Sequence, residues 1–256
     1  MLLLISILAL EAPPTALPRP VTIVAHRGLA EGIPENTLAA FHHSVKRGIA
    51  VIELDVRATQ DGHLVILHDE TLDRTTDCNG RLAELSLARV KACDAGWPSH
   101  PGERIPTLTE ALEVVRGRPI RLLLDIKPGV ELGEALDIVR DHKAEAKVIL
   151  GLRRSADVAT ARAQMPSVPI LAFMPDAVDA AKFASAGAHI IRLWSDWVEA
   201  DPALVDRTRA LGPEVWVMVG KRLPARKREW RDLHTRMIAT GAEGLITDRP
   251  DLTSGP

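Results

Sequence analysis

Short runs of apolar, often β-branched residues recur along the chain, and they alternate with segments in which apolar residues repeat every three or four positions. The first kind of run predicts strands and the second predicts amphipathic helices. In one helical segment Leu38, Phe41 and Val45 share a face, and Gly48 ends the helix. Eight runs predict strands, at residues 21–26, 50–56, 120–126, 146–152, 169–174, 189–194, 214–219 and 243–248.

Eight strand-and-helix units in 256 residues predict an α/β protein with a (β/α)8 or TIM barrel, in one domain of residues 21–256. A doubly wound open sheet usually has fewer strands and a glycine-rich phosphate turn, and no G-x-G-x-x-G follows the first strand. In such a barrel the active site lies at the carboxyl ends of the strands. The side chains at those ends are therefore considered first for chemistry.

Residues 1–20 are excluded from this domain. They combine an apolar segment, MLLLISILAL, with a proline-rich linker, and the apolar segment is too short to span a bilayer as a helix. It has the character of a signal-peptide core, yet no Lys or Arg precedes it and no clear A-x-A site follows. We expect a cytoplasmic protein, with secretion or N-terminal anchoring as the alternative, and leave cleavage of the N-terminus open.

The composition narrows the range of partners. The formal net charge is −2 and the sequence has no stripe of Lys and Arg, so nucleic acid is not expected. The basic run at 221–231 lacks a large apolar face and predicts a solvated helix, so any membrane contact is expected to be peripheral. Cys78 and Cys93 lack a metal-type spacing, and a chain of this size needs no disulfide framework, so both are expected to be free thiols.

The stretch IELDVRATQDGHLVILHD, residues 52–69, carries unusual chemistry for an apolar segment. The turn around Asp61 is too short for a parallel crossover, so the second run must return antiparallel as a hairpin beyond the barrel rim. Glu53 and Asp55 are two apart on a strand and point to the same face, which at a barrel mouth is the inside. The hairpin then returns His68 to the neighbourhood of the two carboxylates.

Two inward carboxylates repel each other and lose hydration unless a cation or a shared proton compensates. Asp125, at the carboxyl end of the next barrel strand, is a candidate third ligand, and Lys127 points the same way. An all-oxygen set favours Mg²⁺ or Ca²⁺ over zinc. We therefore expect one divalent cation, held by Glu53, Asp55 and Asp125.

The first strand ends in AHRG, residues 25–28. His26 can transfer protons near neutral pH, Arg27 can bind a phosphate bidentately, and Gly28 allows the backbone to approach a ligand closely. Two imidazoles beside a bound cation and a guanidinium are suited to phosphodiester cleavage. The cations neutralise charge on the phosphoryl oxygens, one His takes the proton of the nucleophile, and the other protonates the leaving alkoxide.

These residues resemble the glycerophosphodiester phosphodiesterase family. AHRG, PENTLAAF, IELDVRATQDGHLVILHDETLDRTT, IPTLTEAL, LDIKP and GLITDRP occur in the family's order and spacing across nearly the whole domain. The resemblance implies a (β/α)8 barrel of lipid and glycerol metabolism that hydrolyses small-molecule glycerophosphodiesters to sn-glycerol 3-phosphate and an alcohol. It implies three kinds of site residue: metal ligands Glu53, Asp55 and Asp125, the acid and base His26 and His68, and phosphate contacts Arg27 and Lys127.

The sequence departs from the family at Asp125, where Glu is usual. The shorter side chain leaves cation preference open. Separately, a carboxylate on an apolar strand can be one arm of a buried ion pair, so a pair of Asp125 with Arg57 or Lys127 is also left open. Residues 70–106 are too few to hold the large extra domain of some relatives, so large head groups are expected to have free access.

Several neighbouring residues are expected to have supporting roles rather than catalytic or ligand-binding ones. Asn36 or Thr37 is expected to cap the helix that follows, and both are left out of the site together with Glu35. Asp69 is expected to orient His68 from behind, because a catalytic imidazole often needs such a partner.

Three further functions remain open. A lysophospholipase D-type phosphodiesterase would need an apolar groove for an acyl chain, and a non-catalytic phosphodiester-binding barrel would fit the shorter Asp125. A glycoside hydrolase is disfavoured because Glu53 and Asp55 lie on one strand, whereas catalytic pairs straddle the scissile bond. Trp216 could line the mouth of the barrel, but an aromatic residue in a strand is more often core.

Overall fold

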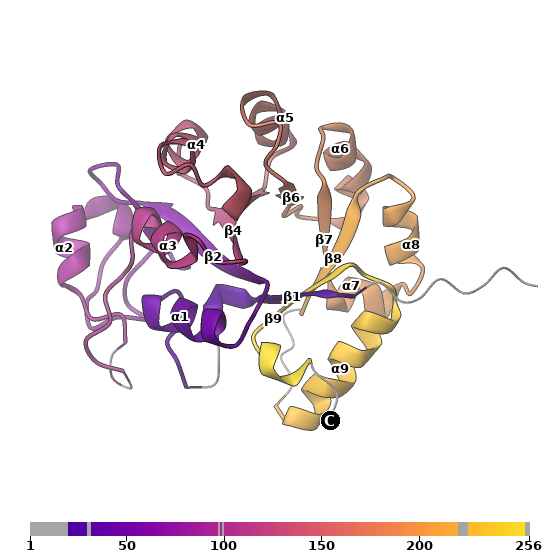
Figure 1. The fold of residues 1–256 in the computed structure, drawn as a ribbon, viewed down its shortest axis with the longest axis horizontal. Coiled ribbons are helices and arrows are strands. Elements are labelled where there is room, and N and C mark those ends of the chain that lie inside the picture. The colour runs from indigo at the N-terminus through magenta and orange to yellow at the C-terminus, as the bar shows by residue number, and fades with distance from the viewer. Residues whose placement is uncertain (1–19, 30–31, 97, 99, 220–224, 254–256) are drawn as a thin grey trace, which may run out of the picture.

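The computed structural model describes residues 20–253 except 30–31, 97, 99 and 220–224. Eight parallel strands follow one another around a barrel, which the pairing of β1 with β2 closes (Figure 1). The expected TIM barrel is thereby confirmed, and each strand lies within the range predicted for it or within two residues of that range. The strands are β1 (Thr22–Ala25), β2 (Val51–Ala58), β4 (Arg121–Ile126), β5 (Val148–Leu152), β6 (Ile170–Ala172), β7 (Ile190–Trp194), β8 (Glu214–Met218) and β9 (Gly244–Thr247).

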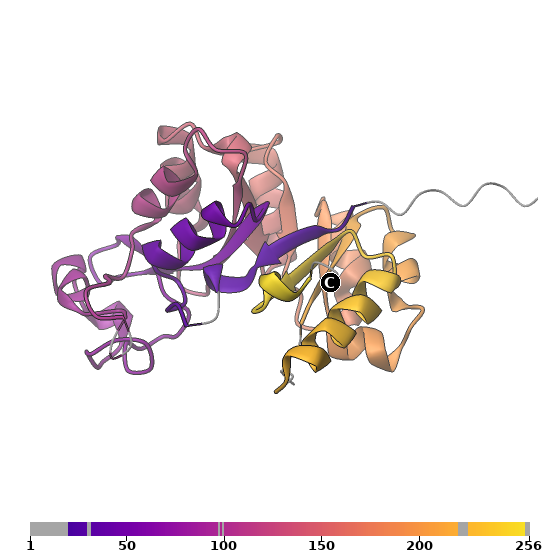
Figure 2. The same cartoon turned by 60° about the horizontal axis from the view of Figure 1, so that its bottom comes forward.

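Helices surround the barrel, as the ribbon in Figures 1 and 2 shows. Thr37 rather than Asn36 caps α1, with its hydroxyl accepting a hydrogen bond from the amide of Ala40. Thr107 and Glu110 form a reciprocal capping box at the start of α3. The longer helices are α1 (Leu38–Lys46), α3 (Leu108–Val115), α4 (Leu132–Asp141), α5 (Ser155–Gln164) and α9 (Lys227–Ala239), and the shorter ones are α2 (Leu87–Ala92), α6 (Ala180–Ser185), α7 (Ser195–Ala200) and α8 (Leu204–Arg209).

The strands bury alternate residues in two different cores. Leu122 and Leu124 of β4 belong to the layer between barrel and helices, whereas Leu123 belongs to the cluster inside the barrel. Trp216 of β8 is 1% exposed and lies in this inner cluster, so it is core, as expected. Its ring lies where a side chain at residue 244 would be, because a Cβ added to Gly244 would come within 2.5 Å of the ring.

The hairpin beyond strand two is confirmed. β3 (Leu64–Ile66) pairs antiparallel with the end of β2, in the register Val56 to Ile66. The chain then makes an excursion up to residue 106 that carries its own small hydrophobic cluster, which includes Leu72, Leu82 and Val90. This excursion lies to one side of the barrel, around α2 (Figure 1).

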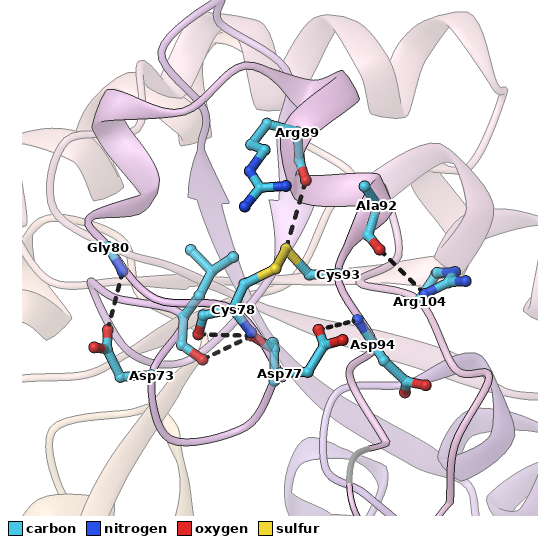
Figure 3. The surroundings of a disulfide bond; sticks show 11 residues. Asp73, Asp77, Cys78, Gly80, Arg89, Ala92, Cys93, Asp94 and Arg104 are labelled. Carbon is cyan, nitrogen blue, oxygen red and sulfur yellow. Dashed lines mark hydrogen bonds between the residues drawn. A yellow bond between two sulfur atoms is a disulfide. The ribbon is translucent and has the colours of Figure 1, made fainter.

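The expectation of free thiols was wrong, because Cys78 and Cys93 form a disulfide (Figure 3). The argument from chain length applied to the barrel core, whereas the disulfide lies in the small satellite cluster of the excursion. A unit of that size buries too little apolar surface to be well stabilised alone, and a crosslink compensates by restricting its unfolded states. The amide of Asp94 also donates to a carboxylate oxygen of Asp77 at 2.7 Å, which joins the same two loops beside the bond.

The described part of the basic run is exposed to solvent, as predicted. The side chains of Arg226 and Arg228 are 84% and 90% exposed, while Trp230 packs inward at the start of α9. Among the described residues, no helix combines the length and the apolar character that crossing a membrane requires. The apolar segment and most of the linker, residues 1–19, lie outside the described residues.

Candidate active site

Three carboxylates meet inside the carboxyl end of the barrel. On β2 the inward alternation that places Val51 in the inner core continues to Glu53 and Asp55, and on β4 it runs from Leu123 to Asp125. Asp55 and Asp125 are direct partners in the register of the two strands. The three acids are 1 to 3% exposed, and each offers an oxygen within 4.8 Å of the other two. The sequence prediction of one acidic cluster is therefore matched by the positions of all three residues.

Lys127 lies between two of these acids. Its Nζ is 2.6 Å from Oδ1 of Asp55 and 2.6 Å from Oδ2 of Asp125. Arg27 Nε lies 3.5 Å from Asp55, and Arg153 Nη2 lies 2.5 Å from Asp125. Burial alone would raise the pKa of Asp55, but Lys127 and Arg27 outweigh it and hold that pKa well below its ordinary value.

Asp125 does form an ion pair, with one of the two partners that the sequence suggested. Lys127 is its partner, together with Arg153, whereas Arg57 donates instead to the carbonyl oxygen of His68 at 2.8 Å. The ion pair does not remove Asp125 from the acidic cluster, because only its Oδ2 is engaged. Oδ1 of Asp125 is buried and has no hydrogen-bond partner among the described residues.

The donor set fits a hard divalent cation. Burial and the charge of Asp55 raise the pKa of Glu53 to about 7, which is the behaviour of a buried carboxylate with too little positive charge beside it. Together with the unengaged oxygen of Asp125, this indicates that the cluster can accept further positive charge. All three candidate ligands are carboxylates, the type that Mg²⁺ and Ca²⁺ prefer. A second group, Asp77 with the two cysteines, is no comparable candidate, because its sulfur atoms form the disulfide.

His26 begins the short 3-10 turn η1 (His26–Gly28) after β1. Its Nδ1 lies 2.5 Å from Oδ1 of Asp248, and its Nε2 lies 3.9 Å from Oε2 of Glu53. Burial would lower the pKa of His26, but Glu53 and Asp248 outweigh burial and raise it. The sequence prediction missed Asp248, although it directly follows β9 in the segment GLITDRP, at the end of the barrel where chemistry is expected.

Arg27 has a left-handed backbone with φ of 54°, an uncommon conformation for a side chain of its size. In this conformation its amide donates to Oε2 of Glu53 at 2.8 Å, while its guanidinium reaches Glu35 at 3.0 Å. Gly28 has a packing reason to be glycine, besides the ligand approach that the sequence suggested. Its φ is 68°, and a Cβ there would come within 2.7 Å of the Phe41 ring, so glycine lets η1 pack on α1.

His68 follows the hairpin and faces the same cavity as the acids. Its Nδ1 lies 2.6 Å from Asp69, as the prediction of an orienting partner required. Arg74 connects Asp69 to Glu35, with distances of 2.6 and 2.7 Å. Burial is the main cause of a lowered pKa of His68, while Arg74 and His68 lower the pKa of Asp69 to about 2.

Two residues that the sequence analysis left out of the site belong to its framework. Glu35 links Arg27 to Arg74, and it lines the cavity. Asn36, at φ of 57°, donates through Nδ2 to Oδ2 of Asp55 at 2.8 Å and accepts from the Asp55 amide at 3.3 Å. The capping rule allowed either Asn36 or Thr37 to cap the helix, and because Thr37 does so, Asn36 is free to hold Asp55.

The cavity between these residues has a volume of about 500 Å³ and opens at the carboxyl ends of the strands. Strands β5 to β8 supply its other half, which the sequence analysis did not identify. These lining residues are Arg153, Phe173, Arg192, Trp194, Met218 and Val219.

Comparison with known proteins agrees with this arrangement. The family model described as the glycerophosphoryl diester phosphodiesterase family matches residues 26–252. The chain is 31% identical over 238 residues to a glycerophosphodiester phosphodiesterase of Caldanaerobacter subterraneus subsp. tengcongensis, covering 90% of this chain and 94% of that one.

Solved structures show the same similarity. A glycerophosphodiester phosphodiesterase of Agrobacterium tumefaciens superposes with a TM-score of 0.77 at 26% identity, over 92% of this chain and 100% of that one. A phosphodiesterase of Oleispira antarctica, solved in complex with its product sn-glycerol 3-phosphate, gives a TM-score of 0.77 at 25% identity, over 92% and 95% of the two chains.

Proposed function

Because the chain belongs to the glycerophosphoryl diester phosphodiesterase family and is a hydrolase of that family, we propose that it hydrolyses glycerophosphodiesters to sn-glycerol 3-phosphate and an alcohol. The observation that carries this proposal is the convergence of His26 and His68 on one cavity with three buried carboxylates. The product complex of the Oleispira phosphodiesterase supports the assignment of the product.

In this proposal Glu53, Asp55 and Asp125 hold one Mg²⁺ or Ca²⁺. When bound, the cation neutralises negative charge that develops on the phosphoryl oxygens. Arg27 and Lys127 face the same cavity and bind the phosphate oxygens, with Asn36 and Glu35 keeping Asp55 and Arg27 in position. The shorter Asp125 reaches the cluster because it is directly opposite Asp55 in the strand register.

The two imidazoles transfer the protons. Each ring has its Nδ1 held by a carboxylate, Asp248 for His26 and Asp69 for His68, which fixes the ring and leaves Nε2 for proton transfer. One His removes the proton of the attacking hydroxyl, and the other protonates the departing alkoxide. The attacking group is water or the neighbouring hydroxyl of the substrate, and trapping a cyclic phosphate would distinguish the two.

The decisive experiment measures release of sn-glycerol 3-phosphate from glycerophosphocholine with Mg²⁺ or Ca²⁺, and again with chelator. Chelation should abolish turnover, and His26→Ala and His68→Ala should each reduce kcat by about 10²–10⁴, the usual contribution of a positioned acid or base. The control is His42→Ala, because His42 is exposed on α1 and away from the cavity. Activity of either active-site variant within about tenfold of wild type would contradict the assigned roles.

We also propose that the protein functions in an oxidising compartment. The bond between Cys78 and Cys93 supports this, because structural disulfides persist outside the reducing cytoplasm. It weighs against the cytoplasmic location that the sequence analysis favoured. Alkylation of the protein directly after cell lysis, followed by mass measurement, should find neither cysteine labelled without prior reduction.

A further inference from the structure

The side of the barrel mouth formed by β5 to β8 has no role in the proposed reaction. The acids, imidazoles and phosphate-binding residues come from β1, β2, β4, β9 and the hairpin, whereas β5 and β7 contribute two arginines, Arg153 and Arg192. In the order of the closed barrel, β7 is four strands from β2 in either direction, so Arg192 lies opposite the strand that carries Glu53 and Asp55.

Arg192 is a buried cation that forms no ion pair among the residues described, although the charge of Asp125 acts on it from a distance. It is 3% exposed, and Nη2 donates to the carbonyl oxygen of Met174 at 3.3 Å. Its Nε and Nη1 are buried without a hydrogen-bond partner in the described parts of the chain. Burial and the neighbouring Arg153 lower its pKa to about 9, so the guanidinium still carries its charge at neutral pH. Buried charges are normally paired, and an unpaired one is costly.

Arg153 adds a second guanidinium to this region. The charged ends of Arg153 and Arg192 lie 5.0 and 5.5 Å from the centre of the same Phe173 ring. Arg192 is also 4.1 Å from the ring of Trp194. The Nε of Arg153 has no partner within the described residues, although its Nη2 holds Asp125. Two like charges beside one aromatic ring repel each other, and an anion between them would remove that repulsion and satisfy the unpaired N–H groups.

We propose that Arg153 and Arg192 form a subsite for a second anionic group, a phosphate or a carboxylate, on one arm of the substrate. This inference rests on the proposed function and specifies its substrate class. In the proposed function the scissile phosphate is already served by Arg27, Lys127 and the cation that the three acids would hold, in the other half of the mouth. The aromatic rings hold the guanidinium of Arg192 in place, and the cavity of about 500 Å³ is continuous between the two halves.

The test compares substrates that differ only in the extra anion. Glycerophosphoserine differs from glycerophosphoethanolamine by a carboxylate, and glycerophosphoglycerol phosphate differs from glycerophosphoglycerol by a terminal phosphate. We expect kcat/KM to favour the more anionic member of at least one pair by about tenfold or more, the usual effect of hydrogen bonds to a charged group. The pair that shows the preference identifies the anion as carboxylate or phosphate.

Arg192→Met should reduce that ratio to about one, and Arg192→Lys should keep part of it. Because the two substrates are compared within each variant, a general loss of activity cancels. Arg153→Gln gives the same comparison if Arg192→Met does not fold. The control Arg228→Met changes an arginine that is 90% exposed on α9 and should keep the wild-type ratio.

Equal kcat/KM within both pairs for wild type would overturn the subsite and leave the proposed function intact. A preference that survives in both Arg192→Met and Arg153→Gln would also overturn it. If no substrate is hydrolysed, the proposed function fails, and calorimetric binding of the same pairs decides the subsite. Tighter binding of the anionic member that is lost in Arg192→Met supports it, and equal binding refutes it.

Discussion

Replacing Lys127 with Met should affect stability and cation binding by the acidic cluster in opposite directions. One amine neutralises two carboxylates, so its loss destabilises the fold but leaves more negative charge for a cation. Lys127 Nζ lies 2.6 Å from both Asp55 and Asp125, and Lys127 is 7% exposed. At an effective dielectric of about 20, each pair at this distance contributes about 6 kcal/mol of attraction. Most of this is offset by the lost hydration of the charges, and breaking a buried pair costs about 3–5 kcal/mol in practice.

Lys127→Met should therefore lower the free energy of unfolding by about 3–5 kcal/mol, which corresponds to a Tm about 10 °C lower in chelator. The divalent cation should bind at least about tenfold more tightly to the variant, because a neighbouring positive charge has gone. Turnover should fall at the same time, since Lys127 is a proposed phosphate contact. Thermal melts and calorimetric titration with Mg²⁺ or Ca²⁺ measure the first two effects.

The pH dependence of the stability loss has a definite sign. In the wild type Lys127 helps to hold the pKa of Asp55 below its ordinary 3.8, so this carboxylate stabilises the fold above that pH. Without Lys127 the largest cause of that lowering is lost, so Asp55 of the variant takes up its proton at a higher pH than in the wild type, and this protonation removes the uncompensated charge. The loss in Tm caused by the substitution should thus be largest well above pH 3.8 and shrink as the pH falls toward and below that value.

The exposed Lys182 of α6 provides the control, since Lys182→Met should change none of these quantities. Cation affinity that is unchanged or weaker in Lys127→Met would refute the assignment of the acids as the metal ligands. A stability loss that grows as the pH falls would refute the assigned charge pairing.

Two further predictions concern residues that the sequence analysis missed or misjudged. Asp248→Asn should keep the Tm but reduce kcat by about 10²–10⁴, because an amide cannot stabilise a protonated His26 or fix the same tautomer. The limb of the pH–rate profile that His26 controls should move to lower pH, and an unshifted profile would show that Asp248 has only a structural role. Replacing Cys78 and Cys93 with Ser should cost about 3 kcal/mol for this loop length, and reductant should then no longer affect the melt, unlike in wild type.

Much of the fold could be predicted because the barrel repeats one local pattern. A strand that is buried on both faces is a nearly continuous apolar run, and the eight runs of this chain are separated by helices of ordinary length. The hairpin was predictable for a similar reason, since the short turn at Asp61 and Gly62 excludes a parallel connection. The disulfide was not, because whether two cysteines meet depends on how a loop-rich excursion folds on itself.

The site residues could be predicted where charged side chains occupy the inward positions of a strand. Glu53, Asp55 and Asp125 stand out because charged residues at inward positions of an apolar strand are costly without a function. Asp248 directly follows β9 and Arg192 lies within β7, so the same rule applies to both, but neither belongs to a spaced pair of like charges such as Glu53 and Asp55. His26 beside Asp248 and the Phe173 ring beside Arg192 come from neighbouring strands, which only the folded barrel brings together.

The position of His68 depends on contacts that the barrel alone does not provide. His68 follows β3 and lies outside the closed ring of strands, so hydrogen bonds from outside that ring help to keep it near Asp55. Arg57 binds its carbonyl oxygen, and Arg74 ties Asp69 to Glu35 on the opposite loop. Because these links are charged and partly exposed, each contributes little to global stability. Their effect is local, since they restrict one imidazole to the mouth and join the start of the excursion to the loop that carries Glu35.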